Sequence, residues 1–142
     1  MINNTLLKRM VSIICSLLIY SCSSNDGSHG INAFIRFNDT NYDFGKIRYK
    51  NETKHIFEFT NPGKIPLVIS NVETSCGCTA ADWTKEPVKP GKSGQIMIKY
   101  DADFPGTFSK TITVHYNGKD SPAILTIKGQ VAYPEDVEGP KE

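Results

Sequence analysis

Apolar and polar residues alternate with a period of two through most of the chain after residue 30, and this alternation predicts β-strands. In the clearest run, Ile96, Ile98 and Tyr100 share one face while Met97 and Lys99 share the other. Comparable runs cover residues 31–37, 42–47, 54–60, 67–72, 108–116 and 123–131. No apolar stripe at helical spacing accompanies them, so the pattern indicates an all-β domain.

Residues typical of tight turns separate these runs. They are Asn61-Pro62-Gly63-Lys64, Pro90-Gly91, Pro105-Gly106 and Asn117-Gly118. About seven short strands at such spacing predict an immunoglobulin-like β-sandwich of antiparallel strands in two sheets, over residues 31–133. Near Asn71-Val72 the alternation slips, which predicts a bulge or a change of sheet. The inward faces are expected to carry Ile31, Ala33, Ile35, Phe37, His55, Phe57, Phe59, Leu67, Ile69, Ile96, Ile98, Tyr100, Phe108, Ile112, Val114, Tyr116, Ala123, Leu125, Ile127 and Val131.

The start of the chain has a different pattern. Lys8 and Arg9 precede an uncharged apolar run from Met10 to Tyr20, which is shorter than the roughly 20 apolar residues of a membrane-spanning helix. The run ends in Leu18-Ile19-Tyr20-Ser21-Cys22, which resembles a bacterial lipobox. This resemblance implies that residues 1–21 are a lipoprotein signal peptide and that Cys22 carries the lipid that holds the protein on a membrane. The alternative is a plain secretory signal with an unmodified Cys22.

Short polar segments flank the predicted domain. Residues 22–30 combine the lipidated cysteine with a flexible tether rich in Ser and Gly, and residues 134–142 form an acidic tail predicted to be disordered. Ser23 does not resemble an inner-membrane retention signal. The expected location is therefore the cell envelope, as an outer-membrane lipoprotein that faces the periplasm or the cell surface.

Composition narrows the class of partner. Hydrophobic residues make up 39% of the chain and charged residues 22%, as in ordinary globular proteins. The formal net charge is +1, and removal of the signal takes away two of the 16 basic residues and none of the 15 acidic ones. This near-neutral balance does not favour nucleic-acid binding, which calls for a basic surface.

One short motif carries a resemblance to a known family. Ser75-Cys76-Gly77-Cys78-Thr79 lies between Asn61-Pro62-Gly63 and Pro87-Val88-Lys89-Pro90-Gly91. With the opening Tyr42-Asp43-Phe44-Gly45, this ordered set resembles a bacterial family of unknown function that carries the Ser-Cys-Gly-Cys-Thr signature. The resemblance runs from about Tyr42 to Val131. It implies a small secreted protein or lipoprotein of Bacteroidetes-like bacteria with an immunoglobulin-like domain, and it implies no activity.

Three interpretations of Cys76 and Cys78 remain open. Residues two apart on a strand share a face, and extended geometry separates their Cα atoms by about 6.6 Å, near the upper limit for a disulfide. Gly77 is expected to help by taking a positive φ. The pair could instead be a thiol redox site or bind a soft cation such as Cu(I). In the third interpretation, the cysteines pack as small apolar residues. We expect a disulfide or a packed pair without chemistry.

Other candidate residues do not assemble into a site. His55 starts a row that faces the core and His115 lies on a polar face, so neither is expected to bind a metal. Trp83 is expected to cover the core rather than to bind a sugar. We therefore expect no enzyme and no cofactor, but a lipid-anchored envelope module that binds or scaffolds an envelope protein or a glycan. The alternative is a thiol redox or copper-handling protein that uses Cys76 and Cys78.

Overall fold

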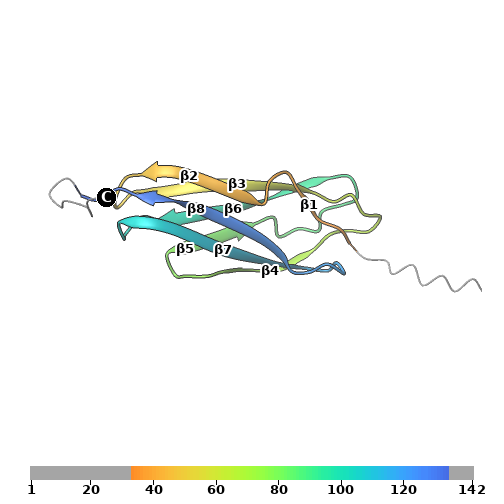
Figure 1. Ribbon diagram of the computed structural model, residues 1–142. Coiled ribbons are helices and arrows are strands. Elements are labelled where there is room, and N and C mark those ends of the chain that lie inside the picture. The colour runs from red at the N-terminus through yellow and green to blue at the C-terminus, as the bar shows by residue number, and fades with distance from the viewer. Residues whose placement is uncertain (1–32, 135–142) are drawn as a thin grey trace, which may run out of the picture. The chain divides into compact units, whose positions relative to one another are not determined.

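The computed structural model describes residues 33–134, and the predicted signal peptide, Cys22 and the tether lie outside this range, as does the tail beyond residue 134. Eight strands form two four-stranded sheets, with orders β1-β3-β6-β5 and β2-β8-β7-β4 (Figure 1). The predicted β-sandwich is confirmed. The strands are β1 (Arg36–Phe37), β2 (Asn41–Ile47), β3 (Glu52–Thr60), β4 (Ile69–Thr74), β5 (Thr79–Trp83), β6 (Ser93–Asp101), β7 (Gly106–Tyr116) and β8 (Ala123–Val131).

The expectation of purely antiparallel strands is wrong for one pair, because β2 runs parallel to β8. The first stretch of the domain is divided between the sheets: β1 pairs with β3 in one sheet, and β2 joins β8 in the other. This β2–β8 ladder is interrupted between Asp43 and Lys46, where Gly45 has a φ of +63° and donates its N–H to Asp43 Oδ1. Alternation reveals which face of a strand is buried but not the direction of its neighbour, so the sequence pattern could not distinguish this arrangement.

The core fills the space between the two sheets and matches the predicted inward faces closely. Phe57, Phe59, Ile96 and Ile98 are almost fully buried. Ile31 lies outside the described residues, and every other expected core residue is also buried except for five that are partly exposed: Ile35, Phe37, His55, Phe108 and Ala123. Full burial of such a side chain stabilises the fold by about 1.5–3 kcal/mol. The predicted slip in β4 is also confirmed, as a register shift between Ile69 and Asn71 against β7.

The connection between β4 and β5 passes from one sheet to the other. As a result, β4 and β5, each the edge strand of its own sheet, lie on the same side of the sandwich, and β1 and β2 are the edges on the other side (Figure 1). The β4–β5 connection lies next to the turn that follows β6, since the Asp101 N–H donates to the Cys78 carbonyl. Ala33 lies at the opposite end of the sandwich, where it forms a bridge with Gly118. Residues 33–134 contain no helix that is long and apolar enough to span a membrane.

Candidate functional site

The cysteine pair lies in the β4–β5 connection and is closed by a disulfide between Cys76 and Cys78. A turn shortens the Cα–Cα distance to 5.3 Å, inside the range of about 4.4–6.8 Å that disulfides require. The expectation for Gly77 is wrong, because the glycines with positive φ are others and the turn closes without it. Gly77 also has open space where a Cβ would point. We call residues 75–79 the disulfide turn.

Hydrogen bonds from two threonines hold the disulfide turn. The Thr74 hydroxyl lies 2.9 Å from the Thr79 carbonyl and 3.2 Å from the Cys76 carbonyl, to which the Thr79 N–H also donates. Ser75 joins the turn to β7, since its N–H donates to the Thr111 carbonyl and its hydroxyl accepts from the Thr111 N–H. The sulfur atoms thus lie in a turn whose backbone is already fixed by neighbouring polar groups.

Hydrogen bonds cap both ends of β5, although it is an edge strand. Along β5, every second residue directs its backbone N–H and C=O toward β6. The Asp101 N–H donates to the Cys78 carbonyl and the Thr84 N–H to the Gln95 carbonyl, so Thr79, Ala81 and Trp83 are the residues whose groups point away from β6. The Thr79 N–H donates within the disulfide turn, the Thr79 carbonyl accepts from the Thr74 hydroxyl of β4, and the Trp83 N–H donates to Asp82 Oδ1 at 2.9 Å. Among the described residues, the outward groups of Ala81 and the Trp83 carbonyl have no such partner.

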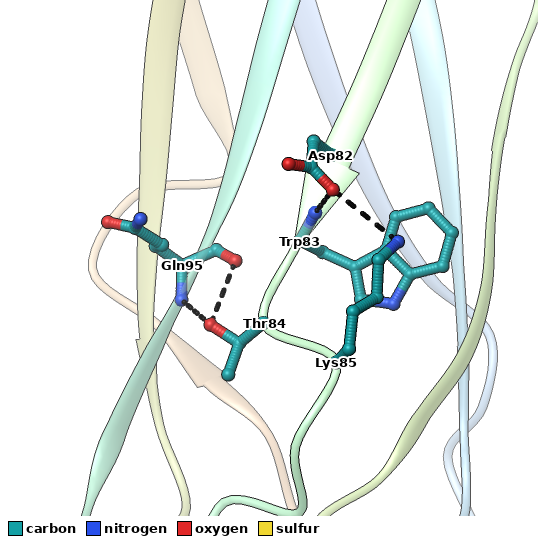
Figure 2. Close-up of polar contacts among 5 residues, drawn as sticks. All are labelled: Asp82, Trp83, Thr84, Lys85 and Gln95. Atoms are coloured by element: carbon teal, nitrogen blue, oxygen red, sulfur yellow. Dashed lines mark hydrogen bonds and ion pairs between the residues drawn. The ribbon is translucent and has the colours of Figure 1, made fainter.

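Trp83 ends β5 in a small polar cluster that we call the Trp83 corner: Asp82, Trp83, Thr84, Lys85 and Gln95 (Figure 2). The indole ring is half-buried against the core, as expected, and Lys85 Nζ lies 2.9 Å from its centroid. Asp82 Oδ1 lies 3.5 Å from the same ammonium. The indole N–H of Trp83 is buried and has no acceptor among the described residues.

Past its register shift between Ile69 and Asn71, strand β4 is the edge with the fewest protections. It pairs with β7 alone. Because the Ser75 N–H donates to the Thr111 carbonyl and hydrogen-bonded pairs alternate along an antiparallel ladder, Glu73 also exchanges backbone hydrogen bonds with Thr113. Val72 and Thr74 therefore direct their N–H and C=O groups to the free side. The strand contains no proline or lysine, which commonly protect edges, and Glu73 is its one charged residue.

The β1–β2 side is closed in a different way. Strand β1 has two residues, and β2 is interrupted by the bulge at Gly45. Tyr42 of β2 stacks on His55 of β3 with ring centroids 3.5 Å apart, so an aromatic pair joins the two sheets. Phe44 and Phe57 surround His55 edge-on. Burial lowers the pKa of His55 below its ordinary value, although nearby Asp39 acts in the opposite direction.

The histidines do not join the cysteines in a site. His55 contacts aromatic rings, and His115 lies on the outer face of its sheet with Nε2 3.5 Å from a Glu73 oxygen. No group of three or more His, Cys, Asp or Glu side chains suited to a metal ion occurs within residues 33–134. Sequence reasoning considered Trp83 but missed Asp82 and Lys85. Their charges at positions flanking the single tryptophan are the signal that was available.

Comparisons with known proteins give a family and a fold. A profile of the family described as "Protein of unknown function (DUF1573)" matches residues 35–131. A search of the curated proteins finds no match.

Among solved structures, a protein of unknown function from Porphyromonas gingivalis W83 is 21% identical with a TM-score of 0.64, over 75% of this chain and 51% of that one. This chain thus spans about half the length of the Porphyromonas protein. The PapD-like domain 7 of human CEP192 is 9% identical with a TM-score of 0.60, over 74% of this chain and 88% of that one. Likeness at these identities shows an immunoglobulin-like, PapD-like sandwich and nothing beyond the fold.

Proposed function

Since the chain belongs to the DUF1573 family of proteins of unknown function, we propose a function from its own residues: a non-catalytic, lipid-anchored module of a bacterial envelope that binds an extended segment of another envelope protein along β4. The observation that carries the proposal is the free backbone of β4 at Val72 and Thr74. An extended segment that joins such an edge gains main-chain hydrogen bonds without requiring a preformed pocket.

The contrast among the four edges supports β4 as the binding strand. Strand β1 is too short to pair with much of a partner, β2 is bulged in its middle, and β5 is capped at both ends. The register shift of β4 lies before Asn71 and leaves the rest of that strand regular. Along β4, the side chains of Val72 and Thr74 are half-buried while Asn71 and Glu73 are exposed on the outer face. A partner strand would thus continue the sheet with one apolar and one polar face.

Crosslinking in cells tests the proposal. A photo-crosslinking residue at Glu73 should form a product with a partner protein, and the same residue at Thr126, on the interior strand β8, is the matched control. The substitution Val72→Pro removes an outward N–H and should abolish the product while the domain stays folded. A product from Glu73 that survives Val72→Pro, or an equal product from Thr126, would argue against pairing at β4.

The lipid anchor is proposed from the lipobox alone, since Cys22 lies outside the described residues. The expected location is the outer membrane, with the domain in the periplasm or at the surface. The change Cys22→Ala should move the protein from the membrane fraction to the soluble fraction, because a signal without this cysteine cannot acquire the lipid. Membrane partition that is unchanged in Cys22→Ala would count against the anchor and leave the β4 proposal intact.

A thiol redox or copper-handling function is the second candidate, and the exposed position of the disulfide turn is the observation that favours it. Gly77 is exposed and both cysteines are partly exposed, so a partner thiolate has access to the bond. Thiol titration and metal analysis of protein purified without oxygen separate the candidates. Free thiols with bound copper would favour this function, whereas a stable disulfide without metal would favour the binding module.

A further inference from the structure

The Trp83 corner already holds a positive charge against an aromatic face. Trp83 is the chain's single tryptophan, and one side of its ring packs on the core. Lys85 Nζ lies over the ring, as Figure 2 shows. It is 2.9 Å from the ring centroid and 3.5 Å from Asp82 Oδ1. A cation over an indole face is attracted by the ring quadrupole, and a carboxylate beside it adds to the attraction.

The contact with Lys85 is exposed enough to exchange. The side chains of Lys85 and Asp82 are 56% and 69% exposed, and an ion pair of this exposure contributes little stability. A cation over an aromatic ring at an exposed site is also a weak contact. The free protein therefore loses little when Lys85 leaves the ring.

The surroundings of the ring are fixed and negatively charged. Thr84 bonds three times to Gln95, through Thr84 N–H to the Gln95 carbonyl, Gln95 N–H to the Thr84 hydroxyl, and that hydroxyl to the carbonyl. These bonds hold the end of β5 on β6 (Figure 2). Asp82 and Glu86 both line the hollow of about 320 Å³ beside the ring. If Lys85 is displaced, two carboxylates remain in this hollow without a cation among its lining residues.

We propose that the Trp83 corner is a recognition site for a basic side chain, arginine or lysine, of a partner protein, and that Lys85 occupies this site in the free protein. Arginine fits best, because its planar guanidinium stacks on an indole and its paired N–H groups match the carboxylate of Asp82. The inference goes beyond pairing at β4, since it concerns side chains on β5 and its flank.

The same ring would also suit a sugar, but the charges favour a cation. A neutral saccharide would gain stacking on Trp83 and leave Asp82 and Glu86 without a counter-charge once Lys85 moved. A basic side chain replaces the ammonium that is already there, so each charge keeps a partner.

The single tryptophan allows a direct test. Its fluorescence is followed while the domain is titrated with two short peptides that are identical except for one residue, arginine or its neutral analogue citrulline. The arginine peptide should perturb the emission of Trp83 and the citrulline peptide should not. In Lys85→Ala the arginine peptide should bind about three- to tenfold more tightly, because the internal competitor is gone.

Two charge variants complete the design. Asp82→Asn keeps an oxygen that can accept from the backbone N–H of Trp83, but it removes the negative charge. It should weaken arginine binding several-fold in the Lys85→Ala background. If that variant is unfolded by circular dichroism, Glu86→Gln takes its place with the same expectation. Equal binding of both peptides, no arginine binding in Lys85→Ala, or perturbation by neutral oligosaccharides alone would overturn the proposal. A Glu73 crosslink that survives Val72→Pro would count against pairing at β4 without changing these outcomes, so the two proposals fail separately.

Discussion

Strands β4 and β5 flank the same side of the sandwich and leave the same turn, yet their edges differ. In β5 the Thr79 N–H bonds within the disulfide turn, the Thr79 carbonyl accepts from the Thr74 hydroxyl, and the Trp83 N–H bonds to Asp82. In β4 the outward groups of Val72 and Thr74 face the free side of the sheet. We therefore expect local polar caps, more than strand length, to decide which edge pairs with a partner, since the two strands have six and five residues.

A second comparison concerns how the two sides of the sandwich are closed. On the β4–β5 side the sheets are joined by the disulfide turn and by the cover that Trp83 provides. On the β1–β2 side the aromatic pair of Tyr42 and His55 joins them. We expect the first side to respond to redox conditions and the second to protonation, and the last two of the four changes below test these responses.

The largest effect is expected for Asn61, which directly follows β3 and lies on neither edge. Its side chain is fully buried, donates to the carbonyls of Ile65 and Val88, and accepts from the Gly63 N–H. Asn61→Leu leaves these groups without partners and should lower the free energy of unfolding by about 3–5 kcal/mol. Urea denaturation measures the loss.

Asn117→Leu is the matched control for Asn61. Its side chain also bonds two backbone groups, the Val68 N–H and the Pro66 carbonyl, but at the surface. Water replaces such bonds, so the expected loss is about 1 kcal/mol or less. Equal losses in the two variants would show that burial of Asn61 is not what makes it important.

The next effect separates the two faces of the β4 backbone. Glu73→Pro removes an N–H that faces Thr113 in the ladder with β7 and should cost about 2–4 kcal/mol. Val72→Pro removes an N–H that faces the free side and should cost roughly 1 kcal/mol, mainly from packing. Glu73→Gln controls for the lost charge. If Val72→Pro proved the more damaging in urea denaturation, the assignment of the free edge would be reversed.

The disulfide is expected to have a smaller effect that is confined to β5. The double change Cys76→Ser and Cys78→Ser opens a very short loop, so it should cost only about 1–2 kcal/mol. Hydrogen exchange should accelerate at the Thr79 amide, which donates to the Cys76 carbonyl, and stay the same at Val72. Equal acceleration at both amides would mean that the turn supports β4 as much as β5.

Much of this architecture follows from the sequence, and its exceptions have physical causes. Ile96 and Ile98 reveal their strand because alternation and burial coincide there. Asn61 belongs to an Asn-Pro-Gly segment that is typical of surface turns, and only the fold brings Val88 close enough to bury it. The contact of Lys85 with Trp83 follows the end of β5, where the backbone has no regular period from which a side-chain direction could be predicted.

The cysteine pair shows the same limit. In an extended strand the Cα–Cα distance of Cys76 and Cys78 would lie near the upper limit for a disulfide. A turn in the β4–β5 connection shortens this distance to 5.3 Å. That turn depends on bonds from Thr74 and Thr79 and on the position of Thr111 in β7. A local pattern of five residues does not contain those partners.

The smallest effect distinguishes the β1–β2 side by pH. Because burial lowers the pKa of His55 below its ordinary value of 6.5, the unfolded chain binds the proton more readily than the folded one. The contribution of His55 is thus fully present above about pH 6.5, and it is lost as the pH falls from that value through the lowered pKa of the folded state. His55→Gln should flatten the stability profile between about pH 5 and 8, where carboxylates contribute little. His115→Gln, on the outer face of the other sheet, is the matched control. A slope that survives His55→Gln would count against His55 as its source.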